Sequence, residues 1–295
     1  MDISIIIVNY NTIDLLLQCI KSIYKHTKEQ TFEIIVVDNA STDNSIPILK
    51  KEFPLVYIIE NSSNQGFGRA NNLGIKKSRG KYIFLLNSDT ILLNDSVNLF
   101  FEFAEKSNCG ALGCILFDKN LLPSHSYGKF PKTNSILKNF LIKEVYSILR
   151  KKTAENVKPL DKKWKEVEYI TGADLFIPAK VLQDIGIFDE SFFMYYEETD
   201  LQYRMHKAGY KRYIIEGPQI MHLHGASTSK EKIIKRFYMD TTSMFIYLKK
   251  HKSNISYYWF RCIFFIINTP IIFYNNYSIK ERILHLKTCL KFTHI

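Results

Sequence analysis

The sequence contains few cysteines and no arrangement that would pair them. The five cysteines are scattered along the chain and include no CxxC pair, which argues against a disulfide scaffold and favours a reducing compartment. Asp2 leads directly into the apolar stretch Ile3–Val8, without the basic segment, apolar core and cleavage site of a secretion signal. These absences predict a cytoplasmic location.

A long hydrophobic run is also absent. The most apolar stretch covers residues 255–274, and its uninterrupted part, Cys262–Phe273, would extend about 18 Å as a helix, against about 30 Å of bilayer hydrocarbon. Arg261 and Pro270 argue further against a membrane span. Because basic residues flank the stretch on both sides, we expect a helix or hairpin in the headgroup region of a membrane. A helix packed on the preceding domain is the alternative.

Basic residues outnumber acidic residues, and the excess lies in two segments of the chain. The net charge of the 295 residues is +11; residues 132–165 contribute +7 and residues 231–295 contribute +8, so the remainder is slightly acidic. A nucleic-acid-binding protein would interleave its basic residues across a folded face. The uneven distribution instead predicts docking of the basic segments on an anionic membrane surface, and no nucleic-acid partner.

Apolar runs alternate with helical spacing over the first 120 residues, which is typical of an α/β protein with a mostly parallel central sheet. We predict strands at Ile3–Val8, Glu33–Val37, Val56–Glu60 and Tyr82–Leu86, and helices at Ile13–Lys25, Ser45–Glu52 and Gly68–Lys77, with Thr12 and Asp43 as N-caps. Farther along, we predict helices at residues 136–149 and at Ala179–Ile185, and one that Gly209 ends. The Lys-rich residues 121–165 are interpreted as a surface insertion.

Polar loops follow three of the predicted strands. They are Asn9-Tyr10-Asn11, residues 38–43 and Asn87-Ser88-Asp89. In an open α/β sheet, ligands bind at the edge where the strands end. Asp38 could accept hydrogen bonds from the ribose or base of a nucleotide, and Asp89 is an oxygen ligand suited to a divalent cation that holds a diphosphate. Taken alone, Asp38 equally fits an Asx turn.

Three carboxylates crowd into residues 197–200, directly after the aromatic run Phe192–Tyr196. Like charges beside apolar rings raise the pKa of a carboxylate, which prepares it to act as a general base. Glu197 and Asp200 are three residues apart and share one face of a helix, so Glu198 faces another way. A solvated helix start with a favourable macrodipole charge is the alternative.

Two histidines, His222 and His224, lie on either side of Leu223. On a strand, their side chains would point to one face and could share a metal ion or a phosphate. Lone histidines are usually structural, and the spacing alone leaves both interpretations open.

Together and in this order, these motifs resemble family 2 of the inverting glycosyltransferases, which have the GT-A fold, and among them the rhamnosyltransferase-like members. The motifs comprise residues 8–11, 36–43, 64–74, 85–90, 171–173, 186–190, 192–204 and 222–227. The resemblance covers about residues 3–230. It implies a single-displacement reaction in which an acceptor hydroxyl attacks the anomeric carbon of a nucleoside diphosphate sugar and inverts its configuration.

The resemblance also implies roles for individual residues. Asp38 would bind the nucleoside, Arg69 the base or diphosphate, and Asp89 and His222 a Mn²⁺ or Mg²⁺ ion; Glu198 would be the catalytic base, and Glu197 and Asp200 would hold the acceptor or position the base. The same motifs supply further substrate-binding positions, namely Asn9, Asn11, Asn39, Asn72, Ser88 and Gly172. Asp174, directly after the motif at residues 171–173, is also expected to bind substrate. His222 matches the metal-binding histidine better than His224. Asn87 departs from the usual Asp-x-Asp metal motif.

The implied organisation is a GT-A catalytic domain over residues 1–230 and a basic, aromatic, helical tail over residues 231–295 that associates with the membrane. Within the domain, residues 1–120 would bind the nucleotide sugar, residues 121–165 form the insertion, and residues 166–230 form the acceptor and catalytic half. By resemblance we expect rhamnose as the donor sugar. The tail predicts a polyprenyl-linked acceptor glycan, as in surface polysaccharide assembly, and peripheral association with the inner face of the cell membrane.

A non-catalytic carbohydrate-binding or scaffold protein with the same fold is the alternative function. Asn87 favours it, because the first carboxylate of the metal motif is missing. Asp89, His222 and the acidic cluster at residues 197–200 argue against it, since a scaffold has no physical need to keep them together.

Overall fold

The computed structural model describes residues 1–138, 162–223, 230–270 and 278–290. The chain divides into two compact units. The first unit consists of residues 1–129, 155–193 and 197–225, and the second of residues 130–154, 194–196 and 226–295. Apolar side chains are buried in both units.

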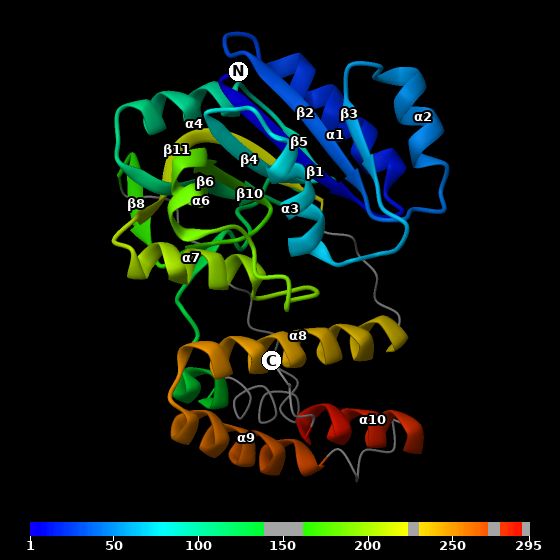
Figure 1. The fold of residues 1–295 in the computed structure, drawn as a ribbon, viewed down its shortest axis with the longest axis vertical. Coiled ribbons are helices and arrows are strands. Elements are labelled where there is room, and N and C mark those ends of the chain that lie inside the picture. Colours follow the sequence, from blue (N-terminus) through cyan, green and yellow to red (C-terminus); the bar gives the residue numbers. More distant parts are fainter. Residues whose placement is uncertain (139–161, 224–229, 271–277, 291–295) are drawn as a thin grey trace. The chain divides into compact units, whose positions relative to one another are not determined.

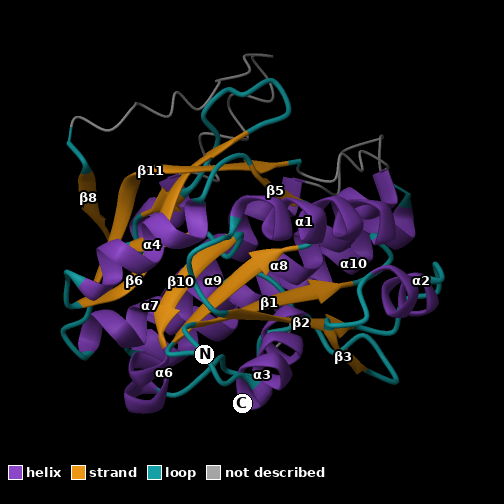
Figure 2. Ribbon diagram, turned by 90° about the horizontal axis from the view of Figure 1, so that it is seen from above, coloured by secondary structure: helices purple, strands orange, loops and turns teal. Residues whose placement is uncertain are grey.

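The first unit is built on a mixed sheet, in which the described residues form nine strands in the order β3-β2-β1-β4-β10-β6-β11-β5, with β8 paired to β11. The strands of this unit are β1 (Ile3–Asn9), β2 (Phe32–Asp38), β3 (Tyr57–Glu60), β4 (Tyr82–Asn87), β5 (Thr90–Leu92), β6 (Cys109–Phe117), β7 (Tyr127–Gly128), β8 (Trp164–Val167), β9 (Tyr169–Ile170), β10 (Asp174–Pro178) and β11 (Lys211–His222). β1 to β4 pair in parallel, with β1, β2 and β3 side by side in Figure 2. β10 enters between β4 and β6 in antiparallel orientation.

Apolar side chains form a buried layer on each face of this sheet. In β1, Ile3, Ile5 and Ile7 belong to one core and Ile6 belongs to the other, as the two-residue period of a strand requires. Strands buried on both faces read as continuous apolar runs. For this reason the predicted strands of the first 90 residues are found, with small shifts at their ends.

Helices of the first unit cover both faces of the sheet (Figure 1). They are α1 (Ile13–His26), α2 (Ser45–Glu52), α3 (Phe67–Lys77), α4 (Ser96–Glu105), α6 (Ala179–Ile185) and α7 (Glu197–Lys207). α1, α2 and α4 pack into the core that contains Ile5, whereas α3, α6 and α7 pack into the core that contains Ile6. The predicted helices in these regions are confirmed, and Gly209, with φ of 83°, follows the end of α7.

The predicted helix caps differ from the observed ones. Thr12 precedes α1, but its side chain makes no capping bond; Asp43 Oδ2 instead accepts from the backbone N–H of Ile13 at 3.1 Å. The cap position of α2 is Asn44, in the left-handed region, and Asp43 Oδ1 accepts from the Ser45 N–H at 3.3 Å. Asp43 thus serves both helix starts, because the loop after β2 passes the beginning of α1.

The second unit is helical over its described residues. It contains α8 (Lys230–His251), α9 (Asn254–Asn268) and α10 (Ile279–Leu290). Residues 133–138 are also helical, and the remainder of the helix predicted at residues 136–149 lies outside the described residues. No described helix is long and apolar enough to cross a membrane. The apolar stretch at residues 255–274 is helical in α9, and residues 271–274 lie outside the description.

An aromatic cluster holds α8 and α9 together. The buried rings are Phe245, Tyr257, Phe260 and Phe264, with Phe245 edge-on to both Phe260 and Phe264. Arg261 is buried beside them and donates to Tyr257 Oη at 3.1 Å and to the Cys289 carbonyl of α10 at 3.3 Å. The arginine of the apolar stretch is therefore an internal link between α9 and α10.

Candidate active site

The loops after β1 and β2 form a buried polar network. The parallel register places Asn9 beside Asp38, and Asn9 Nδ2 donates to Asp38 Oδ1 at 2.8 Å and to Ser45 Oγ at 2.9 Å. The other carboxylate oxygen of Asp38 accepts from the Ser41 N–H at 2.9 Å. Both Asn9 and Asp38 are buried, so the carboxylate is held in one orientation before any ligand binds.

Two further predicted asparagines shape the backbone of these loops. Asn39 donates to Asn64 Oδ1 at 2.9 Å, and its amide oxygen accepts from the Gln65 N–H at 3.0 Å. Asn11 has a left-handed backbone with φ of 55°, and its amide oxygen accepts from the Thr42 N–H at 2.7 Å. These side chains stabilise the loops that border the edge of the sheet, which is a supporting role.

Asp89 and His222 meet at the end of the sheet although they lie far apart in the sequence. β11 runs antiparallel to β5 with His222 opposite Thr90, so that His222 Nε2 lies 3.1 Å from Asp89 Oδ1. Both side chains are mostly buried. The two predicted metal-binding residues are therefore brought together; His224 lies outside the described residues.

The chemistry of this pair fits a divalent cation. A carboxylate oxygen and an imidazole nitrogen, 3.1 Å apart at Asp89 and His222, are both donor atoms that divalent cations accept in proteins. The amide of Asn87 lies alongside, with Nδ2 3.4 Å from His222 Nε2, and its buried Oδ1 has no hydrogen-bond partner among the described residues. An amide flip would present that oxygen. Within the same residues no third histidine, cysteine or carboxylate joins the pair.

The hydroxyl groups of Thr12 and Ser88 connect the Asp89–His222 pair to the loop after β1. Thr12 Oγ1 donates to Asn9 Oδ1 at 2.8 Å and lies 2.9 Å from Ser88 Oγ. Ser88 directly precedes Asp89. The loops after β1, β2 and β4 thus form one continuous polar edge.

The acidic cluster at the start of α7 is partly buried. Glu197 is only 4% exposed, and burial, with the neighbouring Glu198 charge as the second cause, raises the pKa of Glu197 well above its usual value. Over the described residues, Glu197 Oε2 has no hydrogen-bond partner. Glu198 is partly buried and lies by Gly172, where an added Cβ would be 3.7 Å from Glu198 Cβ. As the spacing predicts, Glu198 faces away from the buried Glu197.

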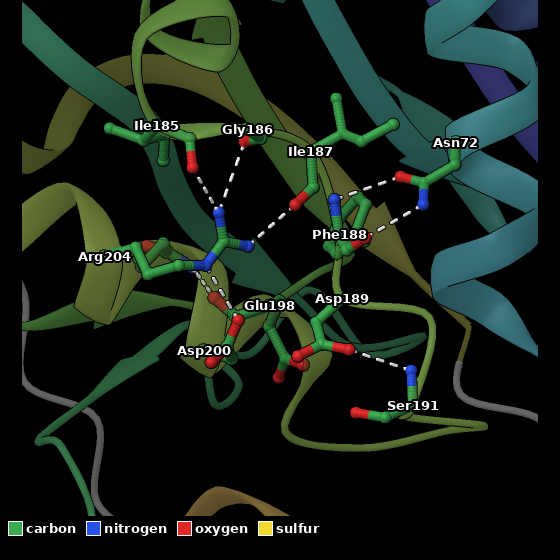
Figure 3. A network of polar contacts seen from close by, with 11 residues as sticks. Asn72, Ile185, Gly186, Ile187, Phe188, Asp189, Ser191, Glu198, Asp200 and Arg204 are labelled. Carbon is green, nitrogen blue, oxygen red and sulfur yellow. Dashed lines mark hydrogen bonds and ion pairs between the residues drawn. The ribbon is translucent and has the colours of Figure 1, made fainter. Parts of the chain in front are cut away.

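Asp200 serves a different purpose from its two neighbours. It is fully buried and accepts from Arg204 Nε at 2.9 Å. The rest of the Arg204 guanidinium donates to the backbone carbonyls of Ile185 and Ile187, each at 2.7 Å (Figure 3). Asp200 therefore orients an arginine that fixes the loop before α7, an interaction that sequence analysis did not find.

Asn72 binds the same loop from the other side. Its amide donates to the Phe188 carbonyl at 2.9 Å and accepts from the Phe188 N–H at 3.0 Å (Figure 3). Because Asn72 is buried and both ends of its amide are occupied, its observed contacts are structural. Its role as a substrate-binding residue stays a prediction that the geometry does not favour.

Arg69 lines a small open pocket. Its Nε donates to the Glu190 carbonyl at 2.9 Å, and it lies 3.8 Å from the Glu190 carboxylate. The pocket has a volume of about 300 Å³ and is lined by Ser63, Asn64, Gln65, Arg69, Glu190, Ser191, Phe192 and Phe193. Arg69 is half-exposed, so a ligand phosphate or base can reach its guanidinium. Glu190, which sequence analysis did not select, holds that guanidinium in place.

Asp174, a predicted substrate-binding residue, lies inside the sheet. It is fully buried in β10, and its Oδ2 accepts from the Cys114 N–H of β6 at 2.7 Å. Burial raises its pKa to about 8. The side chain faces the neighbouring strand, so contact with a substrate would require the sheet to open.

Residues 4–149 match Glycosyl transferase family 2. The chain carries a domain of this family. The match confirms, for residues 4–149, the family predicted from the sequence.

Relatives of this family 2 chain fall into two groups. An uncharacterized glycosyltransferase from Rickettsia bellii is 38% identical over 109 residues, which is 36% of the chain and 15% of that protein; the chain spans only 15% to 18% of such relatives. An N-acetylglucosaminyl-diphospho-decaprenol L-rhamnosyltransferase from Mycobacterium tuberculosis is 23% identical over 220 residues, 69% of the chain and 70% of that protein.

A solved structure extends the fold likeness over nearly the whole family 2 chain. The mannosyltransferase PcManGT from Pyrobaculum calidifontis, in complex with GDP-Man and Mn²⁺, has a TM-score of 0.58 at 13% identity and covers 98% of this chain and 85% of that one. At this identity the likeness shows the fold alone. The predicted GT-A fold with its mostly parallel central sheet is confirmed.

Proposed function

We propose that the protein is an inverting glycosyltransferase that moves a sugar from a nucleoside diphosphate sugar to a hydroxyl group of a glycan. One observation carries the proposal. β4 and β11 bring Asp89 and His222 within 3.1 Å of each other, and the Thr12 bridge joins them to the loop of Asp38. A cation site beside an oriented carboxylate suits a donor that carries both a diphosphate and a nucleoside.

In the proposed reaction, Glu198 accepts the proton of the acceptor hydroxyl. The hydroxyl oxygen bonds to the anomeric carbon as the bond from that carbon to the diphosphate breaks, so the nucleoside diphosphate leaves and the configuration inverts. Burial favours the protonated form of Glu197. The role of base is therefore assigned to its neighbour Glu198, which is partly exposed. A divalent ion held by Asp89 and His222 would supply charge neutralisation for the leaving group.

We propose rhamnose as the donor sugar and a polyprenyl-linked glycan as the acceptor. The relative from M. tuberculosis, which matches the chain over more than two thirds of both lengths, is named as a decaprenol-dependent rhamnosyltransferase. Arg69, half-exposed in its pocket, would bind the base or diphosphate of the donor. Mn²⁺ or Mg²⁺ is the proposed ion, in keeping with the Mn²⁺ named for PcManGT.

We also propose that α9 and α10 bind the cytoplasmic surface of an anionic membrane, which would hold the enzyme near a lipid-linked acceptor. Apolar side chains are exposed on one face of α9, namely Ile255, Tyr258, Trp259 and Ile266, and on α10, namely Ile279, Ile283 and Leu290. Their spacing of three, four and seven residues forms a stripe along each helix. Lys280 and Lys287 are exposed on α10 and match an anionic headgroup layer.

Donor binding is tested by thermal-shift titration with a panel of nucleoside diphosphate sugars, each with and without Mn²⁺. A donor at 100 times its Kd stabilises the protein by about 2.7 kcal/mol. We expect a shift that depends on Mn²⁺ and is lost in Asp89→Asn but kept in Asp14→Asn, whose carboxyl is exposed on α1. No shift with any donor, and no sugar transfer, would instead favour the non-catalytic carbohydrate-binding function.

Membrane binding is tested by co-sedimentation with vesicles that contain an anionic phospholipid. The double substitution Ile255→Ser and Trp259→Ser should reduce binding at least tenfold, because it removes exposed apolar area from α9. The matched control is Leu55→Ser, since Leu55 is equally exposed but lies in the first unit. Equal vesicle binding by both variants would contradict the proposal. A finding that the exposed stripe only joins two copies of the chain would contradict it as well.

A further inference from the structure

The two residues before the acidic cluster have an unusual backbone. Tyr195 and Tyr196 have φ of 70° and 66°, in the left-handed region that bulky residues rarely adopt. Adjacent residues of this kind persist only where surrounding contacts hold them. The next residue in the chain is Glu197, the first residue of α7, followed by Glu198.

Contacts from α8 hold this segment. The segment, residues 194–196, belongs with α8 to the second unit. Ser243 Oγ donates to the Met194 carbonyl at 2.8 Å, and the Tyr247 ring lies 5.6 Å from the Tyr196 ring at an angle of 47°. The Arg236 guanidinium lies 5.6 Å from the centre of the Tyr195 ring.

These three α8 residues share one face of their helix. Arg236, Ser243 and Tyr247 are separated by seven and four residues, which places them in one row along the helix. Ser243 and Tyr247 are buried, so water competes little for the Ser243 hydrogen bond. Each residue of the row contacts a different residue of the segment 194–196.

The backbone just before the segment is also fixed. The Phe193 carbonyl accepts from the N–H of Phe67, the first residue of α3, at 2.9 Å. The chain therefore enters the left-handed turn from a bonded residue and leaves it into α7. The direction in which α7 begins, and with it the orientation of Glu198, depends on how residues 194–196 turn.

We propose that Ser243 and Tyr247 of α8 are positioning residues for Glu198. They hold the left-handed turn at Tyr195 and Tyr196, and the turn sets the first residues of α7. The inference rests on the proposed function, in which Glu198 is the base. It assigns to the C-terminal helical unit a part in the transfer reaction that is separate from membrane binding.

Sugar transfer by the full chain tests the proposal through kcat and KM. Ser243→Ala should lower kcat about tenfold and leave the donor KM unchanged, since the donor contacts lie elsewhere. Ser243→Thr keeps a hydroxyl and should restore most of kcat. Thr241→Val is the matched control, because Thr241 is buried on the same helix and its hydroxyl has no partner among the described residues. A folded Ser243→Ala variant with normal kcat would overturn the proposal.

Amide hydrogen exchange separates this inference from the proposed function. In Ser243→Ala, amides of residues 194–198 should exchange at least tenfold faster than in Thr241→Val, with no change at Asp38 or Asp89. Unchanged exchange would overturn the positioning role even if the wild-type enzyme transfers sugar. Faster exchange in a protein that transfers no sugar would support the claim that Ser243 stabilises the turn at residues 194–196. The same result would overturn the proposed function.

Discussion

At the carboxyl edge of β1 and β2, the buried side chains of Asn9 and Asp38 are bonded to each other and to their loops, whereas at the start of α7 the buried Glu197 lies beside the partly buried Glu198. In the first region, hydrogen bonds between the buried polar groups offset the cost of removing them from water. In the second, burial and a like charge raise the pKa of Glu197, and the preceding backbone is left-handed. The raised pKa and the left-handed backbone each lower the stability of the folded protein.

The difference separates structural support from chemistry. A network of satisfied amides and hydroxyls fixes where a ligand lies, and it stabilises the protein at the same time. A buried carboxyl that prefers its proton destabilises the protein at neutral pH and is retained where it tunes a neighbour. The four predictions that follow test this division, beginning with the substitution of largest expected effect.

Glu198→Gln should lower kcat for sugar transfer about 1,000-fold, because the amide cannot accept the proton of the acceptor hydroxyl. Donor binding, measured by thermal shift with Mn²⁺, should remain within about twofold of wild type. Glu102→Gln, at an exposed surface ion pair on α4, is the control and should leave kcat unchanged. Transfer by Glu198→Gln at a near-normal rate would remove Glu198 as the base.

Gly66→Ala should destabilise the fold by about 3 kcal/mol or more. Gly66 has φ of 88°, and a Cβ at this position would lie 2.2 Å from the Phe193 carbonyl oxygen, so the backbone before the acidic cluster would have to move. Gly172→Ala is the matched comparison, since its Cβ would meet Phe67 and Glu198 at ordinary contact distances of 3.5 and 3.7 Å. Urea unfolding should show a loss below about 1 kcal/mol for Gly172→Ala; similar losses for the two variants would contradict the geometry.

Asn9→Ala should destabilise the protein by about 2 to 3 kcal/mol, because it removes the amide that donates to the buried atoms Asp38 Oδ1 and Ser45 Oγ. The measurement is the free energy of unfolding in urea. Asn108→Ala, at an exposed position directly before β6, should cost less than about 1 kcal/mol. Equal losses would mean that the network does not stabilise the edge as its burial indicates.

Local sequence patterns predicted much of this fold, and long-range pairing limited the rest. The strands around Asn9 and Asp38 are readable because parallel strands buried on both faces are continuous apolar runs. The antiparallel entry of β10 between β4 and β6 depends on tertiary packing and has no local signal, so Asp174 was expected near a substrate and is instead bonded within the sheet.

The same limit applies to the candidate site. The pairing of Asp89 with His222 was expected from the resemblance to a family, since no spacing rule joins the loop after β4 to the end of β11. The hydrogen bonds from Arg204 to the loop before α7 were not predicted, because their acceptors are backbone carbonyls, which every sequence supplies. Only the four-residue spacing from Asp200 to Arg204 could have pointed to it.

Glu197→Gln should stabilise the protein at neutral pH, the smallest and most diagnostic of the expected effects. Burial raises the folded-state pKa of Glu197 above the unfolded value, so the folded protein binds an extra proton between the two pKa values, and stability falls as pH rises above about 4.3, by at most about 1.4 kcal/mol per pH unit. Gln carries no such proton, so the advantage of the variant should grow from pH 4 toward pH 7 in Tm measurements. A constant difference across this range would show that Glu197 ionises normally, and the contrast between the two regions would then rest on the left-handed turn alone.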